Sequence, residues 1–350
     1  MRLSVPLALL ALLGHSSANE VHVVAPSPGP GIDFTTITAA VAAANDGDIV
    51  LVKPGTYNFT TTVATVEAKS LTLVADGSVV PHGIVEVQNL GAGDVFSIRG
   101  FSSIDDLAIE ANQVDGVLWS EDNILGNSSS ICTFTDVARL NLLRTRFLAG
   151  ATSVANSNLA TYDSIFEGRT RGHPGFIYDT ALFLDGGHLF ASGTRLASVD
   201  LFGSIPDIFA TNNPAVDLLD VDADHLPAHT ILPGIARSYE ASATVREGET
   251  LTLEAQGNPG DFVFAFVGTQ PNQLILPANS GALLISPTLP PVFLGAIPPS
   301  GLLESSVTMP YMPPGVEGRV YYSQAVFYEV VGGTAILGPG SMVTLLDESL

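Results

Sequence analysis

The sequence has little cysteine, little positive charge and no long apolar run. Of its 350 residues only one, Cys132, is a cysteine, so no disulfide can form within the chain. Cys132 lies in the apolar stretch 131–134, which indicates a buried and unreactive thiol rather than a nucleophile. A chain of this size without disulfides must be stabilised by its hydrophobic core.

Positive charge is scarce, since Lys53 and Lys69 are the only lysines and the sequence has 13 basic residues against 35 acidic ones. The formal net charge is −22. A surface of this sign repels phosphate backbones, which argues against DNA or RNA as a partner. It favours solubility and weak binding of cations.

The longest apolar run near the start, residues 5–13, is too short to cross a membrane, which takes about 20 apolar residues. Arg2 precedes it, and Ser16 and Ala18 place small residues at the −3 and −1 positions of a cleavage site. This layout predicts a signal peptide over residues 1–18. We therefore expect a secreted or cell-surface protein with no transmembrane segment after cleavage.

Charged residues make up only 14% of the chain, while glycine (34) and proline (23) are frequent. The low charge excludes a disordered chain, and the many turn residues predict numerous short strands. The length allows two domains.

The most informative stretch is 33–57. It predicts a short helix, which Asp33 or Thr35 could cap, followed by a turn at 45–47 and a buried strand at 49–52. The apolar residues of the helix recur with helical spacing: Ile37, Ala40, Val41 and Ala44.

This phrase resembles the N-terminal entry of right-handed parallel β-helix proteins, the pectin-lyase-like superfold. The matching positions are Thr36, Ile37, Ala40, Val41, Ala44, Gly47, Asp48, Ile49, Leu51, Pro54, Gly55 and Tyr57. The resemblance implies that the helix covers the open end of a solenoid, where the first coil has no preceding neighbour.

Three octets support a repeat, namely 140–147, 159–166 and 189–196. Each begins with leucine and ends with a large apolar residue, and the sixth positions are Thr145, Ser164 and Thr194. Stacked coils would place these hydroxyls in one column. The longer interval before the third octet predicts an insertion at 169–178.

The pattern changes twice along the chain. We expect a mainly β protein with a parallel β-helix at 19–202, the end of the solenoid and a linker at 203–239, and a β-sandwich-like domain at 240–350. In the last domain, residues 318–328 resemble a C-terminal β module of secreted bacterial proteins of unknown function. That resemblance implies no activity.

The insertion is the first candidate for a site, because loops that leave a rigid solenoid often carry function. Arginine can hold a carboxylate and histidine can transfer a proton. The catalytic candidates are Arg169, Arg171, His173, Asp179, Asp185 and His188. A solvated loop with local ion pairs is the competing interpretation.

Three further sets of residues carry side chains that could form a site. Asp220, Asp222 and Asp224 would share one face if extended and are candidate Ca²⁺ ligands, although they do not form an EF-hand loop. Asp105 and Asp106 with Glu110 are the nearest approach to a carboxylate pair. Trp119 and the phenylalanines at 262, 264 and 266 could stack on sugars, but alternating phenylalanines more often form a buried sheet face.

No motif names a reaction. Polygalacturonase-type motifs are absent from the sequence, and no cofactor other than Ca²⁺ is suggested. The favoured function is a non-catalytic protein that binds glycans or serves as a scaffold. The alternative is a lyase or hydrolase that acts on an acidic polysaccharide near 169–188. The sequence leaves both open.

Overall fold

The structure, a computed structural model, describes residues 19–57, 62–102, 107–126, 132–148, 152–167, 181–197, 207–224, 226–276 and 281–350. The chain divides into two compact units. The solenoid unit is His22–Leu232, and the C-terminal unit is Pro233–Leu350 together with the N-terminal residues up to Val21. None of the described helices is long and apolar enough to cross a membrane.

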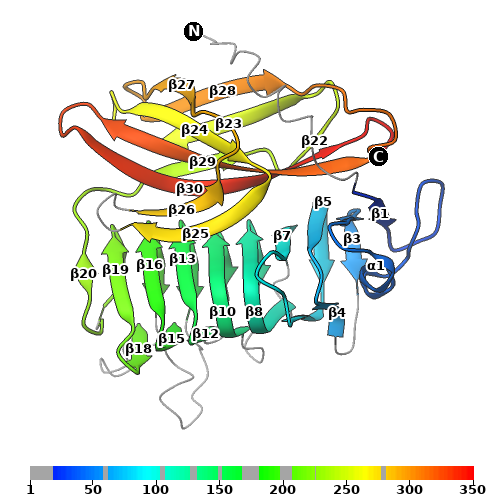
Figure 1. The fold of residues 1–350 in the computed structure, drawn as a ribbon, viewed down its shortest axis with the longest axis horizontal. Coiled ribbons are helices and arrows are strands. Elements are labelled where there is room, and N and C mark those ends of the chain that lie inside the picture. The colour runs from blue at the N-terminus through cyan, green and yellow to red at the C-terminus, as the bar shows by residue number, and fades with distance from the viewer. Residues whose placement is uncertain are drawn as a thin grey trace. The chain divides into compact units, whose positions relative to one another are not determined.

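The solenoid unit is a parallel β-solenoid of about seven turns, and its strands lie side by side in Figure 1. The mainly β class and the parallel stacking predicted from the sequence are thereby confirmed. Each coil carries up to three short strands, which form three faces.

The strands of the first face are β4 (Thr62–Glu67), β6 (Gly83–Gln88), the start of β8 (Leu107–Glu121), the start of β10 (Cys132–Leu143), β12 (Thr152–Ala155), β15 (Leu182–Asp185) and β18 (Ile208–Thr211). The second face has β1 (Val21–Val24), β2 (Ile49–Val52), β5 (Leu71–Pro81), β7 (Val95–Phe101), the ends of β8 and β10, β13 (Asn158–Tyr162), β16 (His188–Ser192), β19 (Ala215–Leu219) and β20 (Thr230–Ile231). The third has β3 (Gly55–Tyr57), β9 (Ile124–Leu125), β11 (Arg146–Phe147), β14 (Ile165–Glu167) and β17 (Arg195–Ala197).

The predicted octets are in register. Leu140 pairs with Leu159, which pairs with Leu189, and Phe147 pairs with Phe166, which pairs with Leu196. The rings of Phe147 and Phe166 stack with centroids 4.7 Å apart. The hydroxyl column is also present, because Thr145, Ser164 and Thr194 are all buried and the Thr145 N–H donates to Ser164 Oγ at 3.2 Å.

The helix α1 (Ile37–Ala43) lies where the sequence predicts it, with Ile37, Ala40 and Val41 buried. Its N-cap is Thr36, whose hydroxyl accepts from Ala39 N–H at 3.2 Å. The expectation of Asp33 or Thr35 as the cap is therefore wrong. Asp33 instead accepts from Val23 N–H at 2.8 Å, which ties the preceding loop to β1.

The C-terminal end of α1 is held by a lysine from the following coil. Lys69 Nζ donates to the carbonyl oxygens of Val41 and Ala44, at 2.7 and 2.6 Å. These carbonyls have no partner within the helix, and a cation there also complements the helix dipole. Desolvation lowers the pKa of Lys69, and the charge of Asp48 opposes that shift.

Every coil turns through residues in the left-handed backbone region. One column of such corners consists of Ala68, Asn89, Gln113, Asp136, Asn156, Gly186 and Asn212, each after a strand of the first face. A second column follows the second face and contains Asp122, Arg144, Asp163, Gly193 and Asp220. Asparagine, aspartate and glycine are the residues that best tolerate this conformation.

The parallel ladder continues past residue 202. β18 and β19 pair with β15 and β16, and β20 pairs with β19 as far as Ile231. Residues 207–231 thus belong largely to the stack, within the segment expected to be the end of the solenoid and a linker.

The C-terminal unit contains three sheets. A three-stranded sheet has the order β21 (Ser238–Ala241), β23 (Thr250–Gln256), β28 (Leu302–Thr308). A five-stranded sheet has the order β22 (Thr244–Arg246), β30 (Thr334–Leu346), β29 (Gly318–Glu329), β24 (Phe262–Gly268), β27 (Val292–Ala296). The hairpin of β25 (Gln270–Leu276) and β26 (Gly281–Ser286) is the third.

Gln324, in the segment that resembles the secreted β module, holds this hairpin to the five-stranded sheet. Its side chain accepts from Leu284 N–H at 2.9 Å and donates to the carbonyls of Ala282 and Gly338, at 2.7 and 2.9 Å. The residue is fully buried, so all three bonds replace bonds to water.

The phenylalanines of β24 do not form the buried face that their spacing suggested. Val263, Ala265 and Val267 are the buried residues of this strand, whereas Phe262 is 39% exposed and packs edge-on against Phe293. Smaller aliphatic side chains fill the inner face, and the rings lie on the outer one.

Burial also makes the thiol of the single cysteine unreactive. Cys132 is 3% exposed, and burial raises the pKa of its thiol to about 12, with a minor contribution from the charge of Glu110. Because only the thiolate reacts, about one molecule in 10⁴ is reactive at pH 8.

We expect no labelling of Cys132 by a maleimide in the native protein within an hour and complete labelling in urea, as measured by mass spectrometry. Rapid labelling without urea would contradict the buried position.

Candidate functional site

The first face of the solenoid presents two columns of outward side chains to solvent. The first column is Thr65, Glu86, Glu110, Thr133, Ser153, Phe183 and Phe209, and the second is Glu67, Gln88, Asn112, Thr135, Ala155, Asp185 and Thr211. The residues between them point inward, as in Val87 and Phe134, and are buried except for the partly buried Ala210. Strand pleating therefore separates a continuous core from a continuous outward surface, which is polar on β4 to β10 and carries phenylalanines on β15 and β18.

A groove of about 380 Å³ runs over β6, β8 and β10 on this face. Its lining is Glu86, Val87, Gln88, Glu110, Ala111, Asn112, Thr133 and Thr135. The side chains that face it offer carboxylate, amide and hydroxyl groups, a mixture of hydrogen-bond donors and acceptors. Groups of this kind are able to form hydrogen bonds with hydroxyl groups.

The first column ends in two aromatic residues. Phe183 and Phe209 are in register on β15 and β18, and their rings stack with centroids 5.8 Å apart and planes inclined by 13°. Both are only partly buried, so part of each ring faces solvent. The face therefore passes from a polar groove to an apolar platform along a single ladder.

Hydrogen bonds between coils orient several of the polar groups. Thr65 Oγ1 donates to Glu86 Oε2 at 3.1 Å, and Asn89 Nδ2 donates to Glu67 Oε1 at 3.1 Å. Asp185 Oδ1 accepts from Thr211 Oγ1 at 2.6 Å and from Asn212 Nδ2 at 2.5 Å. The corner asparagines thus fix acidic side chains of the preceding coil.

The predicted catalytic residues divide into two groups. Arg169, Arg171, His173 and Asp179 lie outside the described residues. Asp185 belongs to the first face, but His188 lies past the Gly186 corner on the second face, where its Nε2 pairs with Asp217 Oδ2 at 2.7 Å. The structure does not bring Asp185 and His188 into one constellation.

The predicted Ca²⁺ ligands do not converge. Asp220 occupies a corner, with a φ of 52°, and Asp222 Oδ2 lies 3.6 Å from Arg195 Nε in an exposed pair. Asp224 belongs to another part of the turn, where its N–H donates to Asp207 Oδ2 at 2.5 Å. Among the described residues, these three carboxylates do not form a group with ligand atoms within 4.8 Å of one another.

Glu110 is the one member of the weighed carboxylate set that the structure describes, since Asp105 and Asp106 lie outside the described residues. Its register partner on the preceding coil is Glu86, so the two carboxylates project from adjacent strands on the same face. The pair therefore comes from two coils rather than from one stretch of sequence.

Trp119 cannot stack on a ligand, because it is fully buried and its Nε1 donates to Glu121 Oε2 at 2.8 Å. Glu121 also pairs with Arg99 at 3.1 Å and with Arg144, and Asp122 accepts from Arg99 and Arg144 at 2.7 Å each. Burial raises the pKa of Glu121, against the lowering effect of the two arginines. Two cations and two anions balance, which indicates a structural network.

Apart from Glu110, which the sequence singled out together with Asp105 and Asp106, the residues of the groove were not predicted, because they come from separate coils at unequal intervals. A signal was present in the corners, where Asn89, Asp136, Asn156 and Asn212 each follow a short alternating stretch. The residues three positions before these corners are Glu86, Thr133, Ser153 and Phe209, which all belong to the first column. Glu110 precedes the less typical corner Gln113 and carries no such signal.

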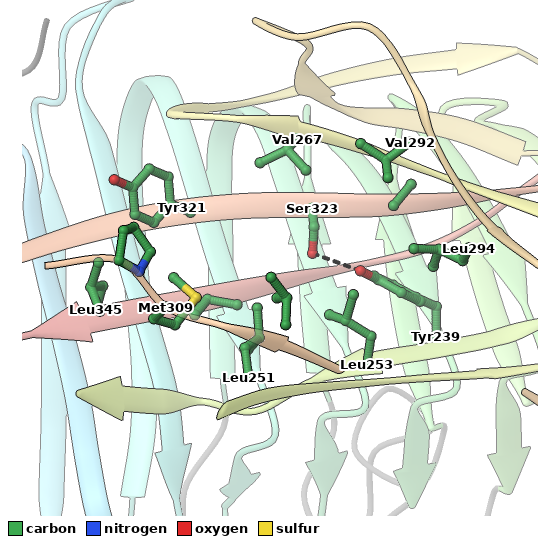
Figure 2. A pocket seen from close by; sticks show the side chains of 14 residues that line it. Tyr239, Leu251, Leu253, Val267, Val292, Leu294, Met309, Tyr321, Ser323 and Leu345 are labelled. Carbon is green, nitrogen blue, oxygen red and sulfur yellow. Dashed lines mark hydrogen bonds between the residues drawn. The ribbon is translucent and has the colours of Figure 1, made fainter. Parts of the chain in front are cut away.

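The C-terminal unit contains a second, smaller cavity between the three-stranded and five-stranded sheets (Figure 2). Its volume is about 40 Å³, and its lining is almost wholly apolar, with Leu251, Leu253, Leu294 and Met309 among the contributors. Tyr239 Oη and Ser323 Oγ satisfy each other at 3.1 Å, as the figure shows. A space of this size is a packing defect between two facing sheets and does not accommodate a sugar.

No protein-family model matches the sequence, and no curated protein matches it. The candidate site is therefore defined by the geometry of this chain alone, as the first face of the solenoid with its polar groove and its phenylalanine pair.

Proposed function

We propose that this protein is a secreted, non-catalytic glycan-binding protein that holds an extended polysaccharide along the first face of its solenoid. The observation that carries the proposal is the single exposed column that joins the groove at Glu86 and Glu110 to the stacked pair Phe183 and Phe209. Hydrogen-bonding groups beside an apolar platform suit a sugar ring, which has polar edges and apolar faces.

The spacing of the column supports an extended chain as the ligand. Neighbouring strands lie about 4.8 Å apart, so like side chains recur at that interval along the solenoid. This interval is close to the length of one hexose in an extended β-linked polysaccharide. Successive sugars could thus meet successive coils, from Thr65 on β4 to Phe209 on β18.

A second candidate function is glycoside hydrolysis, which the register of Glu86 with Glu110 favours. Retaining glycosidases place two carboxyl groups about 5–5.5 Å apart, a separation that adjacent strands can provide. A general acid, however, usually depends on a shielded carboxyl group, and Glu110 is exposed. We therefore place hydrolysis second, and lyase chemistry near 169–188 gains no support from the separate pairs of Asp185 and His188.

Membership of the pectin-lyase-like superfold is part of the proposal. The entry phrase at 36–57, the helix α1 and the parallel stack support it together. The leader-like sequence at 1–18 supports secretion, and the net charge of −22 suits a soluble extracellular protein.

The experiment that tests the proposal replaces both phenylalanines of the apolar platform by alanine. We expect Phe183→Ala with Phe209→Ala to weaken binding of a β-linked hexasaccharide about tenfold, the loss that corresponds to about 1.4 kcal/mol of stacking. Isothermal titration calorimetry gives the dissociation constants, and circular dichroism checks that both proteins are folded.

The matched control is Phe293→Ala, which removes an exposed ring from β27 in the C-terminal unit. It should leave the affinity unchanged. If Phe293→Ala weakens binding and the double variant does not, the glycan site is elsewhere. If reducing ends accumulate and Glu110→Gln stops their release, the protein is a hydrolase and the non-catalytic proposal is wrong.

A further inference from the structure

We infer that Asp185 is a ligand-binding residue, which accepts hydrogen bonds from adjacent hydroxyl groups of the sugar that packs against Phe183. This inference rests on the proposed function, because it assigns a further binding residue of the same face and names the sugar that suits it. That sugar has two adjacent hydroxyl groups without substituents. The argument comes from the position of Asp185 beside the phenylalanine pair and from the way its carboxylate is held.

Asp185 and Phe183 are placed to contact the same sugar. They are two positions apart on β15, so their side chains point to the same side of the strand. Two residues of a strand span about 6.6 Å, a distance that one sugar ring with its hydroxyl groups can bridge. A sugar whose apolar face rests on the Phe183 ring can therefore bring the hydroxyl groups of one edge to the Asp185 carboxylate.

The protein uses one oxygen of this carboxylate and leaves the other to a ligand. Oδ1 of Asp185 accepts from Thr211 Oγ1 at 2.6 Å and from Asn212 Nδ2 at 2.5 Å, which fills the two acceptor positions of that oxygen. Within the described part of the chain no group donates to Oδ2, and the residue is only partly buried. A carboxylate oxygen takes up to two donors, so Oδ2 suits two neighbouring hydroxyl groups.

The carboxylate is oriented before any ligand arrives. Both of its donors come from the following coil, where Thr211 ends β18 and Asn212 forms the next corner with a φ of 54°. Thr211 is also the register partner of Asp185, so the ladder fixes the distance between them. A side chain that is already held in place loses little rotamer freedom on binding, which favours affinity.

The preceding coil leaves room for the sugar. The register partners of Phe183 and Asp185 on β12 are Ser153 and Ala155, whose side chains are short. On the opposite side the ring of Phe209 stacks on Phe183 and covers part of it. We therefore expect the sugar to lie over β12, against the side of Phe183 that Phe209 leaves open.

This arrangement discriminates between free and substituted hydroxyl groups. A bound ligand keeps water away from Asp185 Oδ2, so a ligand without donors at this place leaves the oxygen unpaired. Sites that hydrogen-bond a hydroxyl group reject analogues that lack it for the same reason. Methyl ethers at the two positions should therefore weaken binding through Asp185 in particular.

The test compares a β-1,4-linked glucose hexasaccharide with its 2,3-di-O-methyl form, in the parent protein and in Asp185→Asn. Methylation removes hydrogen bonds along the whole ligand in both proteins, so the informative quantity is the ratio of the two dissociation constants. Asparagine can keep Oδ1 bonded to Thr211 and Asn212 and presents an NH₂ donor in place of Oδ2. We expect this ratio to be about five- to tenfold larger in the parent than in Asp185→Asn.

Asn212→Gly tests the positioning of the carboxylate. Glycine adopts the left-handed corner without strain, so this variant removes the side-chain donor and keeps the backbone conformation. The ratio should fall about two- to threefold, because Thr211 alone then orients Asp185. Calorimetry gives the dissociation constants, and circular dichroism checks that each variant is folded.

Asp115→Asn is the control, since it removes an exposed carboxylate from the same unit outside the two columns. It should leave the ratio unchanged. An unchanged ratio in Asp185→Asn overturns the inference, and so does an equal fall in Asp115→Asn, because the effect would then follow net charge. If Phe183→Ala with Phe209→Ala weakens binding of the unmethylated ligand while Asp185→Asn leaves the ratio unchanged, the proposed function stands and only this inference fails. If the parent binds neither hexasaccharide, the proposed function fails with it.

Discussion

Replacing Arg237 with alanine should cost the C-terminal unit about 3–5 kcal/mol of folding free energy, the range for one partner removed from a buried ion pair. Arg237 is buried, and its guanidinium donates to Asp261 Oδ2 at 2.9 Å and to Glu329 Oε1 at 2.7 Å. A third bond reaches the carbonyl of Ile235 at 2.6 Å. Without the cation, the Asp261 carboxylate stays buried with no compensating charge, and this accounts for most of the loss.

Urea unfolding followed by circular dichroism measures the effect. Arg195→Ala is the matched control, because Arg195 and Asp222 form the same kind of pair with side chains 63% and 84% exposed. Exposed pairs contribute about 0–1 kcal/mol, so this variant should unfold almost as the parent does. Similar small losses in both variants would show that the Arg237 network contributes nothing beyond an ordinary surface pair.

Gly187→Ala should destabilise the solenoid unit by about 2–5 kcal/mol, from two separate causes. Gly187 has a φ of +79°, which costs an L-residue about 1–2 kcal/mol. A Cβ there would also lie 2.0 Å from the carbonyl oxygen of Ser157 in the preceding coil. Relieving that overlap requires the two coils to separate, and overpacking of this kind adds about 1–3 kcal/mol.

Gly31→Ala measures the cost of the positive φ without the steric overlap. Gly31 lies in the same unit with a φ of +69°, and a Cβ there has nothing within 4 Å. Its loss, measured in the same urea titration, should therefore be the conformational part alone. Equal losses in the two variants would mean that the coils at Ser157 and Gly187 are not packed as closely as the structure has them.

The fold was predictable where the sequence repeats and where neighbouring residues carry the signals of a helix and a strand. The phrase at 36–57 encodes α1 and β2 with local signals, namely helical spacing of Ile37, Ala40 and Val41 and then a run of β-branched residues. The octets around Leu140, Leu159 and Leu189 encode the second and third faces, because their inward residues are large and regular. Local patterns of this kind need no knowledge of the rest of the chain.

The candidate site was not predictable in the same way. Its strands are short, and outward residues such as Glu86, Glu110 and Phe183 face solvent, so packing places no constraint on their type. Their register depends on how many residues each coil holds, which varies. The catalytic site was therefore predicted in and just after the insertion, whereas the face is assembled from one or two residues of each of seven coils.

The two columns of corners suggest where this chain can change in length. Seven residues separate Asn156 from Asp163, and likewise Gly186 from Gly193. The other part of the coil ranges from 12 residues between Arg144 and Asn156 to 23 between Asp163 and Gly186. Segments that enter the first face can thus lengthen without disturbing the ladder. The solenoid would serve as a scaffold for peptide display, with grafted segments placed in rows beside the groove.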